Sequence, residues 1–329
     1  MMTELKTSIL SLACLACFAL GACSNRRPAP AAPSLSVTET AFSADSAYSY
    51  VARQLAFGPR VPNTGAHDSC AAWIAEELKR HGARVEIQEG TVRAYDGTEL
   101  KYRNVTGSIC PEAKNRVLLM AHWDSRHVAD NDPKRENRTL PVPAANDGAS
   151  GAAVLLEIAR IASTATPRMG IDLLFADAED YGAPDTWGGK HREEDWALGT
   201  QAWARQAAAR GYTADYGILL DMVGASDATF FREYFSERFA PQTTDLIWSI
   251  AQELGYSSLF VNDEGPAITD DHVFVNRIAR IPTIDIIDTR QQYGQTFYPY
   301  WHTRDDTLDK ISKETLGKVG NVLTTLLFK

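Results

Sequence analysis

Several features are scarce in this chain of 329 residues, and each scarcity excludes a class of protein. Basic residues are outnumbered by acidic ones, 33 to 42, and the net charge of −9 is spread along the chain, so no basic surface is available for nucleic acid. The sequence has no internal repeat, and its composition excludes collagen, coiled coil and disorder. It therefore describes a globular protein with a large core, in one large α/β domain or in two ordinary domains.

The N-terminus lacks an apolar run long enough to span a membrane. The run SILSLACLACFALGA after Lys6 is shorter than the roughly 20 residues that a spanning helix needs, and it fits the hydrophobic region of a signal peptide. It ends in Leu20-Gly21-Ala22-Cys23, which resembles the lipobox of bacterial lipoproteins. We therefore expect a lipoprotein signal peptide over residues 1–22 and lipidation of Cys23, with a plain secretory signal as the alternative.

Residues 23–42 are rich in Pro and Ala and are predicted to form an extended tether. The expected product is an exported bacterial lipoprotein, anchored to the membrane and facing the periplasm. Only Cys70 and Cys110 then remain in the folded part, residues 43–329, too few for a cluster of thiolate metal ligands. In an exported protein these two either form a disulfide or are separate small apolar side chains, and the sequence leaves both alternatives open.

The folded part reads as strands and helices in alternation. Helix periodicity covers residues 43–57, 66–81, 149–162, 196–210, 242–254 and 312–327, and β-rich stretches cover 84–94 and 99–109. Short, continuous apolar runs, typical of strands buried on both faces, are Arg116–Ala121, Ile171–Ala176, Tyr216–Leu220 and Thr283–Ile287. This pattern predicts a single α/β domain with a mostly parallel, twisted central sheet covered by helices on both faces.

Acidic and imidazole side chains follow the apolar strands directly. The first run leads into His122, the second into Glu179 and Asp180, and the third into Asp221. Because ligands bind outside the carboxyl ends of parallel strands, these side chains should converge on one site, bordered by the polar loops 125–143 and 181–195. Asp147 precedes a helix, and His302 lies near the C-terminus; both can reach the same site.

Each of these residues also has an ordinary structural interpretation. Asp147 in particular could simply cap the helix that begins near Ala149. Burying so many carboxylates without a cation, however, would cost several kcal/mol per ion. Carboxylate and imidazole without thiolate suit a catalytic zinc ion with an open coordination position, so the set predicts zinc binding.

The motifs HWDS, NDGASG, DAED, LLD and WHT, in this order and spacing, resemble those of the zinc-dependent aminopeptidases, whose members share a single α/β domain. Within that group the chain looks most like the animal-type glutaminyl-peptide cyclotransferases, of which bacterial members exist. The residues that carry this closer resemblance are Trp301 before His302, the run Thr269-Asp270-Asp271-His272, the segment 220–225, and Trp187.

The resemblance implies an activity and a role for each residue. It implies one zinc per chain held by Asp147, Asp180 and His302, with Glu179 as general base and acid, and with Asp221 in a hydrogen-bonded acidic pair with Asp271. Trp187 and Trp301 would form the walls of the substrate pocket, and His122 would be a second-metal ligand or a neighbour of the ligands. Asp180 departs from the glutamate of the animal enzymes, which shortens its reach by one methylene.

The expected reaction converts the N-terminal glutamine of peptides and exported proteins to pyroglutamate, with release of ammonia. All five ligand positions of a two-zinc aminopeptidase are nevertheless occupied, by His122, Asp147, Asp180, Asp221 and His302. An aminopeptidase that removes N-terminal residues is therefore the alternative. An inactive domain that serves as a surface binding module is a third hypothesis, which the complete set of ligands and Glu179 disfavours.

Overall fold

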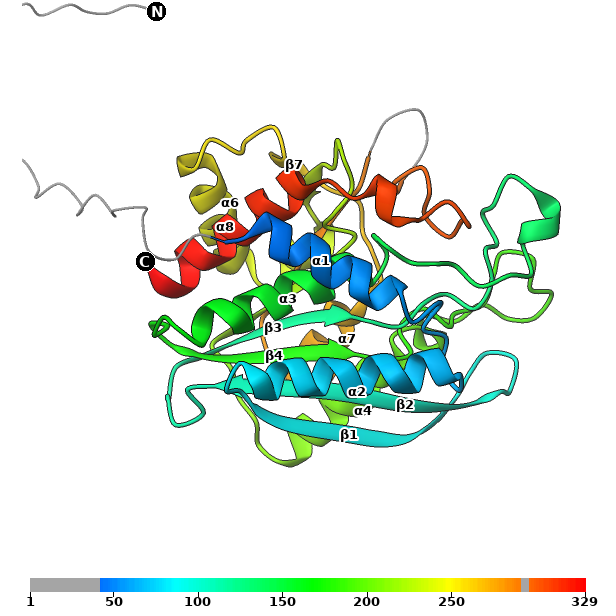
Figure 1. Cartoon of the computed structure of the whole chain (residues 1–329), viewed down its shortest axis with the longest axis horizontal. Coiled ribbons are helices and arrows are strands. Elements are labelled where there is room, and N and C mark those ends of the chain that lie inside the picture. Colours follow the sequence, from blue (N-terminus) through cyan, green and yellow to red (C-terminus); the bar gives the residue numbers. More distant parts are fainter. Residues whose placement is uncertain (1–41, 291–295) are drawn as a thin grey trace, which may run out of the picture. The chain divides into compact units, whose positions relative to one another are not determined.

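The computed structural model describes residues 42–290 and 296–329, and its centre is a six-stranded sheet with the order β1-β2-β4-β3-β5-β8 (Figure 1). The strands are β1 (Arg84–Arg93), β2 (Glu99–Ile109), β3 (Arg116–His122), β4 (Gly170–Ala176), β5 (Tyr216–Asp221) and β8 (Thr283–Ile287). Strands β4, β3, β5 and β8 pair in parallel, whereas β1 and β2 form an antiparallel hairpin along β4. The predicted mostly parallel sheet is confirmed.

The apolar runs of the central strands supply two cores, one on each face of the sheet. In β3, Val117 and Leu119 belong to the larger core, while Leu118 and Met120 belong to the smaller one. Successive side chains of a strand point to opposite faces, so a strand that is covered on both faces must be apolar at every position. This requirement explains the continuous apolar runs in the sequence.

The larger core lies under the helices α1 (Ala44–Leu55), α2 (Gly65–Arg80), α3 (Ala149–Ala162), α6 (Pro241–Glu253) and α8 (Lys313–Phe328). Helix α3 packs on β3 and β5, and α1 and α8 pack on α3, as Figure 1 shows. The opposite face is covered by α4 (Leu198–Ala209) and by α7 (Asp271–Phe274), which continues into a π-helical turn (Val275–Ala279). Helices therefore cover both faces, as expected.

The short elements were not foreseen from the sequence. They are a small second sheet of β6 (Phe230–Arg232) and β7 (Phe260–Glu264), the helices α5 (Tyr234–Phe239) and α7, and three single-turn 3₁₀ helices at 135–137, 193–195 and 308–310. A strand of three residues and helices of four to six carry too little periodicity to be recognised, and β7 has the sequence FVNDE, which is not a continuous apolar run.

The N-terminal segment and the two cysteines of the folded part were the subject of separate predictions. The predicted signal peptide, Cys23 and nearly all of the tether lie outside the described residues. No helix within the described ranges is long and apolar enough to cross a membrane. Cys70 is buried and Cys110 is exposed, and both are free thiols, so the disulfide alternative is not realised here.

Candidate active site

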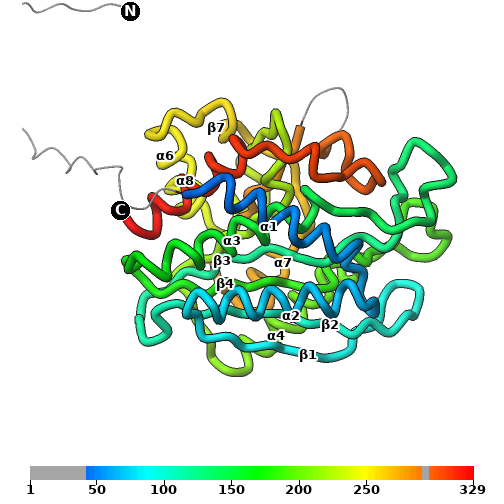
Figure 2. Tube along the Cα trace, viewed as in Figure 1, coloured from blue at the N-terminus to red at the C-terminus, as the bar shows by residue number. Residues whose placement is uncertain are grey.

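The carboxyl ends of the parallel strands form one wall of a cavity of about 540 Å³. Glu179 and Asp180 follow β4, and Asp221 ends β5; all three line this cavity, together with Asp147 and His302. The loop after β3 projects from this end of the sheet, at the right of Figure 2. The structure thus brings the sequence-predicted site residues together at the strand ends, where the topology of a parallel sheet places ligands.

Asp147, Asp180 and His302 form a compact cluster of buried side chains whose candidate ligand atoms lie within 4.8 Å of one another. His302 Nε2 is 3.2 Å from Asp180 Oδ1 and 3.7 Å from Asp147 Oδ2. Asp147 Oδ2 and Asp180 Oδ2 are buried and have no hydrogen-bond partner within the described part of the chain. Two buried, unpartnered carboxylate oxygens in a cluster with an imidazole fit a bound cation, since burial without a partner is costly.

A second cluster shares Asp147 with the first and adds His122 and Asp221. His122 Nε2 lies 3.1 Å from Asp147 Oδ1 and 3.1 Å from Asp221 Oδ1. Asp147 therefore turns one oxygen to each cluster, which is the arrangement of a carboxylate that could bridge two ions. The five positions of a two-metal site are all present in space as well as in sequence.

Backbone strain is concentrated at the site. Ala178, Met222 and His302 have φ values of 51°, 49° and 55°, in the left-handed region that non-glycine residues rarely adopt. These residues precede Glu179, follow Asp221 and carry a candidate ligand, respectively, so the chain turns sharply where the site is built. Such strain persists only where surrounding contacts fix it, and it is typical of functional sites.

Gly148, which follows Asp147, also has a positive φ, of 99°. A Cβ atom there would lie 2.8 Å from the Asp124 carbonyl oxygen and 2.9 Å from His122 Cε1. Only glycine allows the backbone to approach His122 this closely. Gly148 is the N-cap residue of α3, so no side chain caps this helix. The Asp147 carboxylate lies beside His122 and His302 instead of capping α3.

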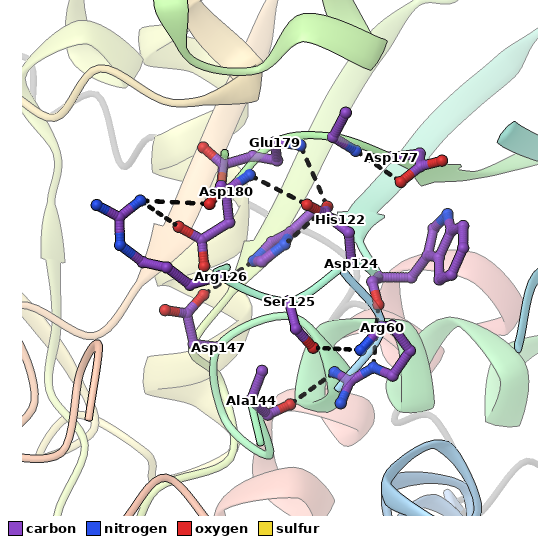
Figure 3. Close-up of polar contacts among 12 residues, drawn as sticks. Arg60, His122, Asp124, Ser125, Arg126, Ala144, Asp147, Asp177, Glu179 and Asp180 are labelled. Atoms are coloured by element: carbon purple, nitrogen blue, oxygen red, sulfur yellow. Dashed lines mark hydrogen bonds and ion pairs between the residues drawn. The ribbon is translucent and has the colours of Figure 1, made fainter. Parts of the chain in front are cut away.

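Two buried aspartates that sequence reasoning did not single out hold the ligand loops. Asp124 accepts hydrogen bonds from the backbone N–H groups of Glu179 and Asp180, at 3.1 and 3.2 Å (Figure 3). Asp306 accepts from the N–H groups of Asn146 and Asp147 and from the Tyr298 hydroxyl. Both lie inside motifs that the sequence displays, HWDS and WHTRDDT, but their role depends on contacts with distant segments.

Glu179 lines the cavity directly beside the candidate ligand Asp180 and belongs to neither metal cluster. Burial raises its pKa well above the ordinary value, and the neighbouring carboxylates of Asp270, Asp180 and Asp271 add to the effect, while His122 opposes it. A carboxyl group with a raised pKa holds a proton more readily than an ordinary glutamate, and a group that both accepts and releases a proton is what general base and acid catalysis requires.

The structure differs from the sequence expectation at Asp271. Asp270 lines the cavity, whereas Asp271 is fully buried and lies outside the lining. Asp221 Oδ1 lies 3.1 Å from His122 Nε2, and neither carboxylate oxygen of the expected partner Asp271 has a hydrogen-bond partner within the described residues. Burial and the neighbouring Asp221 raise the pKa of Asp270 to about 7. Of these two consecutive residues it is Asp270 that lines the cavity together with Asp221, because the two side chains point in different directions where α7 begins.

The structure also differs from the sequence expectation in which tryptophans line the pocket. Trp301 lines the cavity as expected, stacked on His302 with ring centroids 3.7 Å apart. Trp187 does not line it; this ring packs edge-on against Tyr95 in the rim, at 5.0 Å. Trp196 lines the cavity instead and lies parallel to His302 at 6.4 Å. A loop sequence with two tryptophans gives no signal of which one turns inward.

A parallel α/β sheet with a buried carboxylate–imidazole cluster at its strand ends defines a metal-dependent enzyme. The chain belongs to peptidase family M28, whose family profile matches residues 104–327. This confirms the family that the sequence motifs indicated.

The chain is also similar to individual proteins of known structure or activity. A glutaminyl cyclase structure from Bacteroides thetaiotaomicron is 49% identical, with a TM-score of 0.86, covering 88% of this chain and 98% of that one. A structure described as a Zn-dependent exopeptidase from Parabacteroides distasonis is 48% identical with the same TM-score, covering 88% and 99%. The glutaminyl-peptide cyclotransferase of Bos taurus is 23% identical over 258 residues; the match spans 69% of this chain and 66% of the bovine protein, just under two thirds.

Proposed function

We propose that this protein is a zinc-dependent glutaminyl-peptide cyclotransferase, which converts N-terminal glutamine to pyroglutamate and releases ammonia. The observation that carries the proposal is the content of the cavity: Glu179 and Asp270 lie beside the ligand clusters, and Trp301 encloses the space above His302. Similarity to solved glutaminyl cyclases over most of the chain supports it. The acids supply groups that can transfer protons, and the aromatic rings supply an apolar surface beside the candidate metal ligands.

The residues present fit zinc. Asp147, Asp180 and His302 provide oxygen and nitrogen donors without thiolate, and two of their carboxylate oxygens are otherwise unpartnered. Zinc held by these three residues would supply a Lewis acid that polarises the γ-carbonyl group of the substrate glutamine.

In the cyclisation, the α-amine nitrogen forms a bond to the side-chain amide carbon, and the bond from that carbon to the amide nitrogen breaks. Glu179 takes a proton from the α-amine and delivers it to the departing nitrogen, so the leaving group is ammonia and the carboxyl group returns to its starting state. The reaction is intramolecular, so holding the glutamine side chain folded toward its own amine provides much of the acceleration.

Asp221 and Asp270 are placed to control the leaving nitrogen. Both line the cavity, and the Asp221 carboxylate raises the pKa of Asp270, because two neighbouring carboxylates resist double ionisation. A pair that holds one proton can both accept a hydrogen bond from the amide N–H group and donate one as ammonia forms. Sharing a proton in this way also limits the negative charge beside the metal ligands.

Water must be kept from the reacting carbon, because hydrolysis of the amide would compete with cyclisation. Beside its polar residues, the cavity lining includes four large apolar side chains: Ile268, Phe297, Trp196 and Trp301. Phe297 also packs on Trp301, with ring centroids 4.6 Å apart. We infer that these apolar side chains shield a bound glutamine side chain from water.

A two-zinc aminopeptidase is the second candidate, and the cluster of His122, Asp147 and Asp221 favours it. In that enzyme His122, Asp147 and Asp221 would hold a second ion, and Glu179 would act on water. Asp270 has no evident task in this alternative.

The two functions are separated by a product assay with the soluble form that lacks residues 1–37. A glutamine-initiated peptide should keep its full number of residues and lose ammonia, and a leucine-initiated peptide of otherwise identical sequence should remain intact. Glu179→Gln should lower the rate at least about 10²-fold, as for loss of a general base. Release of free glutamine or leucine would instead establish the aminopeptidase.

Export and membrane attachment are a separate proposal, supported by the sequence of residues 1–42 alone. We propose that Cys23 carries the lipid and that the enzyme acts on exported proteins at the periplasmic face of a membrane. In cells grown with a labelled fatty acid, the full chain should be labelled and should sediment with membranes. Cys23→Ser should lose the label; a labelled Cys23→Ser protein would contradict the assignment.

A further inference from the structure

We propose that Arg126 and Asp130 form a positioning pair that presets two of the three zinc ligands, Asp180 and His302, before the metal binds. Both residues belong to the loop after β3, four positions apart, and neither lines the cavity. The proposal rests on the assignment of zinc to the cluster of Asp147, Asp180 and His302. It adds a second layer of residues that decides which atoms of this cluster face the ion.

Asp130 acts on the imidazole ring. Its Oδ1 atom lies 3.3 Å from His302 Nδ1, on the side of the ring away from Asp147 and Asp180. An Nδ1–H group that donates to this carboxylate leaves Nε2 with its lone pair, and Nε2 is the nitrogen that faces the two candidate carboxylate ligands. A carboxylate behind a ligating histidine fixes both its tautomer and its ring orientation.

Arg126 acts on the carboxylate ligand. Its Nη1 atom donates to Asp180 Oδ1 at 3.3 Å, to the Asp180 carbonyl oxygen at 3.2 Å and to the Gly182 carbonyl oxygen at 3.3 Å. Figure 3 shows the guanidinium turned toward Asp180 from the side opposite Asp124. Arg126 thus holds the carboxylate through Oδ1, the atom that lies 3.2 Å from His302 Nε2, while Oδ2 has no hydrogen-bond partner within the described residues.

The two residues are themselves locked together. Arg126 Nε and Nη2 donate to the two oxygens of Asp130 at 2.8 and 2.7 Å, a fork-to-fork ion pair in which the Arg126 side chain is 1% exposed. The same guanidinium lies over the ring of Trp196, 5.0 Å from its centroid, and Trp196 in turn lies parallel to His302. Both ligands are thus connected to a single buried, planar, permanently charged group.

This pair also gives a reason for the shorter carboxylate at position 180. An aspartate reaches one methylene less far than a glutamate, so its angular position must be fixed more strictly to present an oxygen to the ion. Three hydrogen bonds from one Arg126 nitrogen, to the Asp180 side chain and to the backbone on both sides of residue 181, hold it there.

The test measures zinc affinity by competition with a chromophoric chelator, using metal-free protein that lacks residues 1–37. Asp130→Asn should weaken zinc binding about 10-fold to 100-fold, the usual effect of losing a carboxylate behind a ligating histidine. Arg126→Lys keeps the charge but loses the fork, and should weaken binding about 10-fold. Both variants should also change the visible absorption of the cobalt-substituted protein, which reports ligand geometry.

Asp132→Asn is the matched control. Asp132 is a buried aspartate of the same loop that accepts from the Lys134 and Arg304 backbone N–H groups and from the Asn137 side chain, without contact to a ligand. This variant should lower the Tm of the metal-free protein and leave zinc affinity and the cobalt spectrum unchanged.

The outcomes separate this inference from the proposed function. Weak zinc binding by the parent protein would contradict the proposed function itself. Tight binding by the parent that persists in Asp130→Asn and Arg126→Lys, with an unchanged cobalt spectrum, would overturn the positioning role alone. If Asp130→Asn does not fold, Arg126→Lys decides the question by the same two readouts.

Discussion

Removing the Trp301 ring should open the cavity without removing the metal site. One indole buries about 150–250 Å², and we take roughly half of that area, one ring face, as available to the substrate side chain. At about 25 cal/mol per Å², losing roughly 100 Å² of contact costs about 2–3 kcal/mol, or roughly 30-fold to 150-fold in kcat/KM. The second face of Trp301 packs on His302 and is not part of this sum.

The expected phenotype of Trp301→Ala is therefore a large fall in kcat/KM for glutamine-initiated peptides with zinc content close to that of the parent. Zinc should persist because Asp130 and Trp196 still hold the His302 ring. Trp187→Ala removes a ring of the same size from the rim, where it packs on Tyr95, and should have a much smaller effect. The reasoning is refuted if Trp301→Ala cyclises as fast as the parent, or if it loses zinc or unfolds.

Three further predictions concern the backbone, the metal and the thiols. Gly148→Ala should destabilise the protein to urea by about 1–3 kcal/mol, because Gly148 has φ 99° and a Cβ atom would clash with His122; an unchanged unfolding midpoint would contradict this. Elemental analysis after dialysis against trace zinc should give close to one zinc per chain; two tightly bound ions, with activity rising on the second, would favour the aminopeptidase. In the form lacking residues 1–37, a thiol reagent should modify exposed Cys110 quickly and Cys70 only after unfolding, since burial raises the pKa of Cys70 to about 12; equal reaction rates would contradict the burial of Cys70.

The sheet and the main helices could be predicted because their signals are local. A strand such as β3 is apolar at every position since both of its faces are buried, and an amphipathic helix such as α2 shows its period over 16 residues. The convergence of His122, Asp180 and Asp221 followed from topology alone, because parallel strands end at the same edge. These inferences require no knowledge of side-chain orientation beyond the strand.

The features that the sequence did not predict depend on the direction of single side chains or on contacts between residues far apart in the chain. Asp270 and Asp271 are chemically identical neighbours, and only the turn into α7 decides which of them faces the cavity. Trp196 faces the cavity while Trp187 packs on the rim, a choice made by contacts with Tyr95 from the β1–β2 hairpin. Arg126 and Asp130 looked like ordinary polar loop residues, because their partners Asp180 and His302 are distant in sequence.

The most direct test of the central claim follows the side-chain nitrogen of the substrate. A peptide whose N-terminal glutamine carries nitrogen-15 only in its side-chain amide is incubated with the zinc-loaded protein that lacks residues 1–37. Cyclisation predicts that the label leaves as ammonia and that the remaining peptide keeps every residue, with a blocked N-terminus. Label recovered in free glutamine, with a peptide one residue shorter, would contradict the account and identify an aminopeptidase.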